Sequence, residues 1–179
     1  MTRDLVERAM HGDTEAFGTL AQARLERLVG AAGLILRDAD AADDAVQDAL
    51  VRAWRDLPRL RDADRFDAWL HRIVLRSCTD QLRQRARARH DDLSADLATW
   101  SDSPLEDRDE LTRALASLTD EHRVVIVLHY YLGLSQPQIA DALKTRVGTV
   151  KSRLSRAIQY LRAELDSSAR GRPARQELS

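Results

Sequence analysis

The sequence has little of what usually builds cross-linked or β-rich small proteins. A single cysteine, Cys78, stands among 179 residues, which excludes an internal disulfide and any cluster of thiolate zinc ligands. There are only 7 glycines and 4 prolines, and aromatic residues make up 4% of the chain. So few turn residues and aromatics argue against strands and hairpins. Strong helix formers such as Ala, Leu, Arg and Glu dominate instead, so we predict an all-α protein.

Signals for membranes, metals and catalysis are also missing. No stretch approaches the roughly 20 apolar residues that span a bilayer, and the first residues lack the apolar core of a signal peptide. We therefore expect a cytoplasmic protein without membrane insertion. There is no Gly-rich phosphate loop, and neighbouring carboxylates such as Asp43 and Asp44 point in different directions on a helix. No metal-ligand spacing links the histidines, which are His11, His71, His90, His122 and His129. We expect no metal, no cofactor, no catalytic residue and no enzyme activity.

The net charge of -1 hides a strong alternation of sign along the chain. Acidic residues dominate from Asp38 to Asp56, and arginines dominate from Arg72 to Arg89. The pattern then repeats, with an acidic stretch over residues 91–110 and a basic stretch over residues 144–175. Contact with phosphates needs local basic surfaces rather than a basic chain. The alternation predicts two basic DNA-binding surfaces and separate acidic surfaces that meet another protein or each other.

Apolar residues recur at helical spacing in the first half of the chain. They predict one helix running to Leu36, a second that ends near Leu57 before Pro58, and a third, basic and amphipathic, that begins near Phe66. The periodicity is lost after Ala88, where Asp and Ser gather. We predict two small helical domains, residues 1–90 and 109–166, joined by a flexible acidic linker over 91–108. Residues 167–179 are expected to form a disordered basic tail.

The second domain is predicted to contain a helix-turn-helix. Ser135-Gln-Pro-Gln138 has the pattern of a capping box at the start of a short helix. A tight turn and a longer basic helix follow, and the inner face of that helix begins at Val147. The helical spacing turns one contiguous strip away from the core, where it can enter a major groove. The strip consists of Lys151, Ser152, Ser155 and Arg156.

Two residues precede this strip. Gly148 and Thr149, near the helix start, are expected to bring backbone amides close to a phosphate. The alternative interpretation of the strip is a solvated basic face on a C-terminal helix.

Two passages resemble a known family. Asp38 to Arg55, which contains Val46-Gln-Asp48 and Ala53-Trp-Arg55, and then Arg65 to Ile73, resemble region two of the extracytoplasmic-function (ECF) sigma factors. Leu134 to Leu143, followed by Val147-Gly-Thr-Val-Lys-Ser-Arg-Leu154, is similar to the region-four helix-turn-helix of the same family. The resemblance covers about Asp13 to Leu165, and it has both halves in order with a linker between them. It implies an alternative sigma factor that binds core RNA polymerase and directs promoter-specific transcription initiation.

The resemblance also implies roles for single residues. The acidic helix would dock on the clamp helices of the largest polymerase subunit through Asp43, Asp44, Gln47, Asp48 and Arg52. The loop from Leu57 to Phe66 would take a flipped base of the minus-ten element. Contact with the minus-ten region and its melting strands would involve Arg61, Arg65, Phe66, Trp69, His71, Arg72 and Arg76. The minus-thirty-five element would be read by the strip on the last helix with Gly148 and Thr149.

Further partners follow from the same resemblance. The segment from Leu118 to Leu132 would contact the flap of the other large polymerase subunit. An anti-sigma factor is expected to bind between or around the two domains, and the protein is expected to be a monomer outside the holoenzyme. Spacing alone favours a core position for Trp69, because Ile73 follows four residues later.

Several positions depart from the family pattern. Lys144 and Arg146 stand where Gly and Pro are common in the turn before the last helix, so this turn must form without glycine. Ala45 replaces a larger aliphatic residue and Asp48 replaces Glu, which we expect to soften the polymerase contact.

Two other functions stay open at this point. One is a dimeric helix-turn-helix repressor or activator, which would bind a palindromic operator. The other is a pure interaction protein, such as a polymerase-binding antagonist that uses the acidic helix alone.

Overall fold

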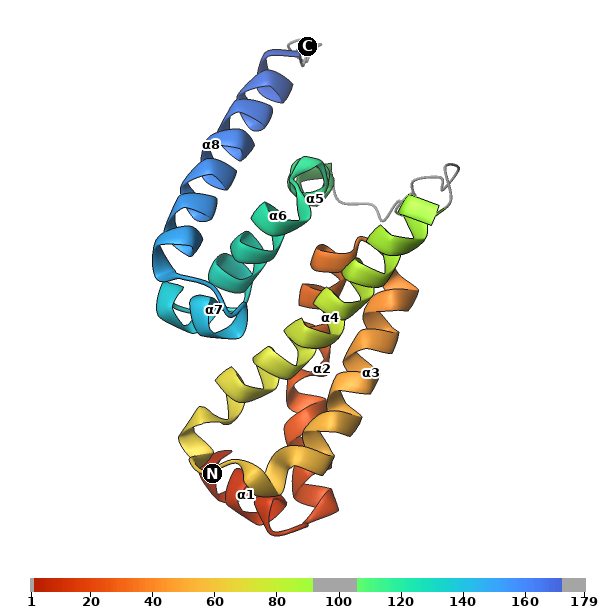
Figure 1. Cartoon of the computed structure of the whole chain (residues 1–179), viewed down its shortest axis with the longest axis vertical. Helices are drawn as coiled ribbons and strands as arrows, with labels where there is room; N and C mark the ends of the chain where they lie inside the picture. Colours follow the sequence, from red (N-terminus) through yellow and green to blue (C-terminus); the bar gives the residue numbers. More distant parts are fainter. Residues whose placement is uncertain (1, 92–105, 172–179) are drawn as a thin grey trace, which may run out of the picture.

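The first half of the chain folds into a helical bundle. The computed structural model describes residues 2–91 and 106–171, and every regular element in these ranges is helical (Figure 1). The four helices are α1 (Thr2–Met10), α2 (Thr14–Leu36), α3 (Ala39–Asp56) and α4 (Phe66–Asp91). Two 3-10 turns, η1 (Leu57–Arg59) and η2 (Ala63–Arg65), connect α3 to α4. Helices α2, α3 and α4 pack against one another, and α1 lies against α2 and both turns. The prediction of an all-α protein is confirmed.

Local signals place the helix boundaries of this domain. The Asp38 side chain accepts a hydrogen bond from the Ala41 amide at 3.0 Å and caps α3. Just before it, Arg37 has φ 57°, the left-handed conformation that reverses the chain after α2. Helix α3 ends at Asp56, as Pro58 predicted. Cys78 is fully buried, and this burial raises the pKa of its thiol to about 12, so the side chain serves as apolar filling.

The second half forms a smaller helical domain. It consists of α5 (Glu106–Ser117), α6 (Asp120–Ile126), the π-helical turn η3 (Val127–Tyr131), α7 (Gln136–Ala142) and α8 (Val147–Gly171). Ser135 and Gln138 form both hydrogen bonds of the predicted capping box. Two boundaries differ from the prediction. Helix α5 begins inside the expected linker, and α8 continues through residues 167–171 because no helix breaker precedes Gly171.

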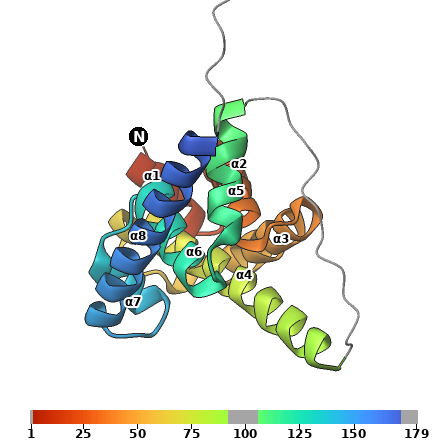
Figure 2. The ribbon, with the colours of Figure 1, turned by 90° about the horizontal axis from the view of Figure 1, so that it is seen from above.

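The two domains pack directly against each other, which the sequence did not predict. Helix α2 contacts α5, α6 and η3, while α4 contacts α7 (Figure 2). One continuous cluster of buried apolar side chains extends through both domains. Arg123 of α6 is only 3% exposed and donates from Nε to the carbonyl oxygen of Ile35 at 3.1 Å. A Cβ at Gly30 would collide with the Tyr131 hydroxyl, so glycine permits this close approach.

Candidate promoter and polymerase interfaces

The recognition strip of α8 faces solvent. Lys151, Ser152, Ser155 and Arg156 are all exposed, as predicted, whereas Val150 and Ala157 on the opposite face are fully buried. Within the part of the chain that the structure describes, neither Lys151 nor Arg156 forms an ion pair. Both cations are therefore available to a ligand, and the strip needs no rearrangement to become accessible.

The start of α8 differs from the prediction in one donor. The Thr149 amide donates to the carbonyl oxygen of Arg146 at 3.0 Å, so the helix itself already uses this donor. Gly148 is exposed beside it. Thr149 can therefore offer a phosphate its side chain but not its amide, because one N–H group makes one good hydrogen bond.

The turn between α7 and α8 forms without glycine. Lys144 has φ 51°, and its amide donates to the Asp141 carbonyl oxygen at 3.2 Å. The Thr145 amide donates to the Ala140 carbonyl oxygen at 2.9 Å. This is the pair of bonds that closes a Schellman motif, whose left-handed residue is usually glycine. The prediction that this turn forms without glycine is confirmed. Lys144 adopts the left-handed conformation instead, which residues with a Cβ rarely do.

The acidic residues of α3 lie on one exposed face. The exposed residues on this face are Asp43, Asp44, Gln47 and Asp48. The Arg52 side chain is 42% exposed, and its Nη2 lies 3.9 Å from Asp48 Oδ2. Val51 occupies the same face and is 65% exposed. Ala45 is fully buried, so its small size affects packing beneath the face rather than the face itself.

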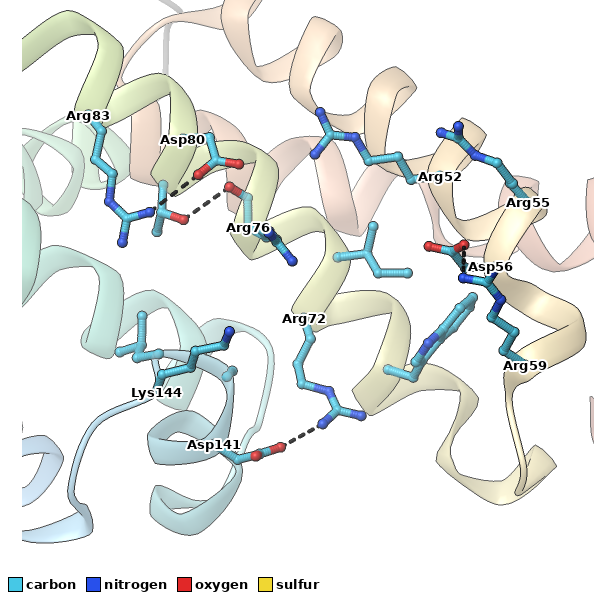
Figure 3. Close-up of a pocket in the computed structure, with 15 residues that line it drawn as sticks. Arg52, Arg55, Asp56, Arg59, Arg72, Arg76, Asp80, Arg83, Asp141 and Lys144 are labelled. Carbon is cyan, nitrogen blue, oxygen red and sulfur yellow. Dashed lines mark hydrogen bonds and ion pairs between the residues drawn. The ribbon is translucent and has the colours of Figure 1, made fainter.

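A basic groove is lined by residues of α3, η1, α4 and α7 (Figure 3). It has a volume of about 1020 Å³ and lies between the two domains. Its cationic side chains come from α3, η1, α4 and the turn after α7, and they outnumber its acidic ones, Asp56, Asp80 and Asp141. The cations are Arg52, Arg55, Arg59, Arg72, Arg76, Arg83 and Lys144. Of these, only Arg52, Arg72 and Arg76 were predicted as site residues, because the others join the groove only through the tertiary fold.

The predicted minus-ten residues occupy very different environments. Arg61 and Arg65 are exposed on and beside the turn η2. Phe66, by contrast, is 2% exposed, and the Arg24 guanidinium covers its ring at 5.2 Å from the ring centroid. Phe66 therefore belongs to the core and offers no stacking surface in this arrangement. Trp69 packs on Phe66 with ring centroids 5.9 Å apart, is half-buried, and still lines the groove.

The remaining three residues lie further along α4. His71 is half-buried at the interface between the domains, and burial lowers its pKa, which favours the neutral imidazole. Arg72 is exposed but forms an ion pair with Asp141 of α7 at 2.6 Å. Arg76 is exposed and forms no ion pair among the described residues. The structure thus brings Trp69, Arg72 and Arg76 together in the groove and leaves Arg61 and Arg65 on the neighbouring turn.

One arginine of α4 serves the fold instead of a surface. Arg85 donates to the Leu36 carbonyl oxygen at 3.1 Å and to the Asp38 carboxylate at 2.7 Å. It thereby ties the end of α2 to the start of α3. The Ala41 amide and then the Arg85 guanidinium lower the pKa of Asp38. The charge pattern alone had grouped Arg85 with the DNA-facing arginines.

The described residues contain neither a candidate metal site nor a candidate membrane span. No group of three or more His, Cys, Asp or Glu side chains is placed to hold a metal ion in residues 2–91 and 106–171. No helix in the same ranges combines the length and the apolar character needed to cross a bilayer.

Comparisons with known proteins agree with this geometry. Residues 20–88 match the family model of Sigma-70 region 2, and residues 108–161 match that of Sigma-70, region 4. The RNA polymerase sigma-H factor of Pseudomonas aeruginosa is 32% identical over 87% of this chain and 89% of its own length. The ECF RNA polymerase sigma factor SigM of Mycobacterium tuberculosis is 35% identical over 86% of this chain and 79% of its own.

A solved structure is similar as well. It is the sigma factor RpoE of Bartonella quintana, crystallised in complex with the anti-sigma factor NepR. The two chains are 27% identical and superpose with a TM-score of 0.76, over 86% of this chain and 98% of the other.

Proposed function

The chain belongs to the extracytoplasmic-function sigma factors, and on that basis we propose which of its surfaces binds core RNA polymerase and which bind promoter DNA. As a sigma factor it directs RNA polymerase to promoters and starts transcription there. Its role is recognition, and we assign it no catalytic step. The observation that carries the assignment of surfaces is their difference in charge: α3 exposes an acidic face, the groove that adjoins it at Arg52 is basic, and α8 exposes a basic strip.

The strip of α8 is proposed to read the minus-thirty-five element. Lys151 and Arg156 are exposed and unpaired among the described residues, as a side chain must be to reach guanine O6 and N7 in a major groove. Ser152 donates its hydroxyl to the Thr149 carbonyl oxygen at 3.0 Å, which leaves the hydroxyl oxygen as an acceptor. Gly148 and the Thr149 side chain are proposed to lie near the phosphates beside the element.

The basic groove is proposed to hold the opened strands of the minus-ten region. Single strands bind where cations follow the backbone and an aromatic ring stacks on a base. Arg72 and Arg76 supply the cations, and Trp69 is the aromatic side chain that lines the groove. Arg61 and Arg65, on the turn that leads into α4, are proposed to contact the flipped base. Burial removes Phe66 from this proposed set. His71 is half-buried at the interface between the domains and does not line the groove.

The two DNA sites cannot engage a promoter together while the domains are packed. Elements centred 35 and 10 base pairs upstream of a start site lie about 85 Å apart on straight duplex, at about 3.4 Å per base pair. In the packed arrangement Arg72 contacts Asp141 directly. Lys151 follows Asp141 by only ten residues, which span at most about 36 Å even when fully extended. We therefore propose that the domains separate before both elements are bound.

Polymerase and regulatory partners follow from the exposed faces. The acidic face of α3 is proposed to dock on the clamp helices of the largest subunit. In the segment from Leu118 to Leu132, most apolar side chains are buried, so contact with the flap is proposed to rest on Tyr130, which is 63% exposed. An anti-sigma factor is a further proposed partner, supported by the Bartonella complex. Polymerase and promoters lie in the bacterial cytoplasm, where we propose that the protein acts as a monomer until it joins the holoenzyme.

Gel filtration with sigma-free core RNA polymerase tests the proposal most directly. The folded protein is expected to co-elute with core and to start transcription at discrete sites on genomic fragments. Replacing Asp44 and Asp48 by Lys should abolish co-elution, while replacing Lys151 and Arg156 by Ala should leave co-elution intact and abolish specific starts. Absence of co-elution, together with a stable homodimer and binding to a palindrome, would favour a dimeric regulator instead.

A further inference from the structure

The short helix α1 lies beneath the turns that carry the proposed minus-ten contacts. It is amphipathic, with Val6 and Ala9 each 1% exposed, and it packs on α2, η1 and η2. The family model of region 2 begins at residue 20, so α1 lies outside the matched segment. The amino-acid sequence alone indicates no role for this helix. Its position on the two turns, rather than on the long helices alone, is the observation that needs an explanation.

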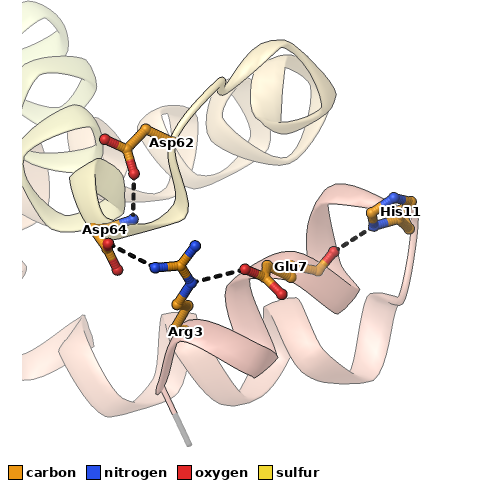
Figure 4. Close-up of polar contacts among 5 residues, drawn as sticks. All are labelled: Arg3, Glu7, His11, Asp62 and Asp64. Atoms are coloured by element: carbon orange, nitrogen blue, oxygen red, sulfur yellow. Dashed lines mark hydrogen bonds and ion pairs between the residues drawn. The ribbon is translucent and has the colours of Figure 1, made fainter.

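Arg3 connects this helix to the second turn (Figure 4). Its Nε donates to Glu7 Oε1 at 2.9 Å, and its Nη1 donates to Asp64 Oδ2 at 2.9 Å. Asp64 belongs to η2, whose N-cap Asp62 accepts a hydrogen bond from the Asp64 amide at 3.0 Å. The side chain of Asp64 is therefore free to face Arg3 while its amide holds the turn. One guanidinium thus links the start of α1 to the middle of the connection between α3 and α4.

The connection from η1 to η2 is buried on the side that faces α1 and exposed to solvent on its other side. Leu57 is fully buried and Ala63 is 9% exposed, and both belong to turns that contact α1. Arg61 and Arg65, on the outer side, are exposed. A recognition loop that is already held in one conformation loses less conformational entropy when it binds, because its backbone has fewer alternative conformations to give up. Because α1 contacts both η1 and η2, it can hold the connection in one conformation.

We propose that α1 holds the connection η1–η2 in its binding conformation and that Arg3 is a positioning residue for the minus-ten contacts, an inference that rests on the proposed function. Arg3 acts through Asp64 on Arg61 and Arg65, without contacting DNA itself. The side chains of Arg3 and Asp64 are 64% and 63% exposed. Exposed ion pairs contribute modestly, so the pair is expected to change a rate or an affinity by about 1.4-fold to fivefold.

A charge-swap cycle isolates this role. The variants are Arg3→Glu, Asp64→Arg and the double variant, in which the introduced guanidinium would face Glu7 as well as the introduced carboxylate. The measured quantities are the rate of promoter opening by the reconstituted holoenzyme, its preference among minus-ten variants, and its affinity for core. Each single variant is expected to lose up to about fivefold in discrimination at the minus-ten element. The double variant is expected to recover to within about twofold of the wild-type protein, with affinity for core unchanged throughout.

Arg8→Glu is the matched control on the same helix. Arg8 forms an ion pair with Asp13 at 2.7 Å and does not reach either turn. Its replacement should lower stability without changing the minus-ten preference. Additive losses in the cycle, or an equal change of preference with Arg8→Glu, would overturn the role of Arg3. If the wild-type protein itself fails to bind core or to start transcription, the proposed function fails instead, so the two failures are distinguishable.

Discussion

The two proposed DNA surfaces are built in opposite ways. The strip on α8 is a product of its own helix: the residues that the 3.6-residue period turns outward are exposed and unpaired among the described residues. The basic face of α4 is decided by its neighbours. Asp141 of the other domain engages Arg72, the α2–α3 junction uses Arg85, and Phe66 is buried under Arg24. A charge pattern therefore locates a surface well where the polar side of a helix stays exposed, as on α8, and poorly where other elements contact that side, as on α4.

Breaking the contact between the domains should have the largest effect. Arg123→Met removes the buried guanidinium whose donors satisfy the carbonyl oxygens of Ile35 and Leu118. Buried carbonyl groups left without a partner cost about 1–3 kcal/mol each, so we expect a loss of about 3 kcal/mol in the free energy of unfolding. Urea unfolding followed by circular dichroism measures it. Arg83→Met, at a side chain that is 71% exposed, is the control and should change stability little.

Because the α8 strip is exposed, a substitution in it should change promoter specificity without unfolding the domain. Arg156→Ala should relax the preference at one base position of the minus-thirty-five element by about 1–3 kcal/mol. Transcription from a series of promoter variants measures this. Arg153→Ala is the charge-matched control, because Arg153 forms an ion pair with Glu121 at 2.8 Å instead of facing solvent. An unchanged base preference with Arg156→Ala would remove this residue from the recognition surface.

A substitution in the turn before α8 tests whether backbone strain at Lys144 lowers the stability of the second domain. Lys144→Gly should raise the free energy of unfolding by about 1 kcal/mol, because glycine adopts the left-handed conformation without the steric cost that a Cβ imposes. Thermal unfolding is the measurement. Thr145→Gly, one residue later and without a positive φ, should lower stability instead. Equal effects of the two substitutions would show that strain at Lys144 contributes nothing.

The smallest effect is expected at the ion pair that links α4 to α7. Asp141→Ala frees Arg72, and exposed pairs contribute about 0.2–1 kcal/mol, so affinity for a single-stranded minus-ten oligonucleotide should rise by no more than about fivefold. Fluorescence anisotropy at low salt measures it. The gain should disappear when Arg72→Ala is added. A gain of the same size in both backgrounds would mean that removing an acidic charge from the groove, not releasing Arg72, causes the effect.

Most of the fold follows from patterns that lie close together in the chain. Helical periodicity predicted α2, α3, α4 and α8, Pro58 predicted the end of α3, and Ser135 with Gln138 predicted the start of α7. The nine-residue helix α1 escaped prediction because so short a segment carries only a weak periodic signal. The exposed face of α3 and the strip of α8 were also predicted, because both depend only on which side of a helix is buried.

The amino-acid order alone thus determined the helices, their exposed faces and the sigma-factor family, since capping and periodicity act over a few residues. Only the tertiary structure decided that Phe66 is covered, that Arg123 joins α6 to α2, and that arginines of two helices share one groove with Lys144. Those contacts join residues far apart in the sequence, and Arg123 reaches across 88 positions to Ile35. Such pairings depend on how whole helices pack, and packing is settled by shape and burial over the entire core.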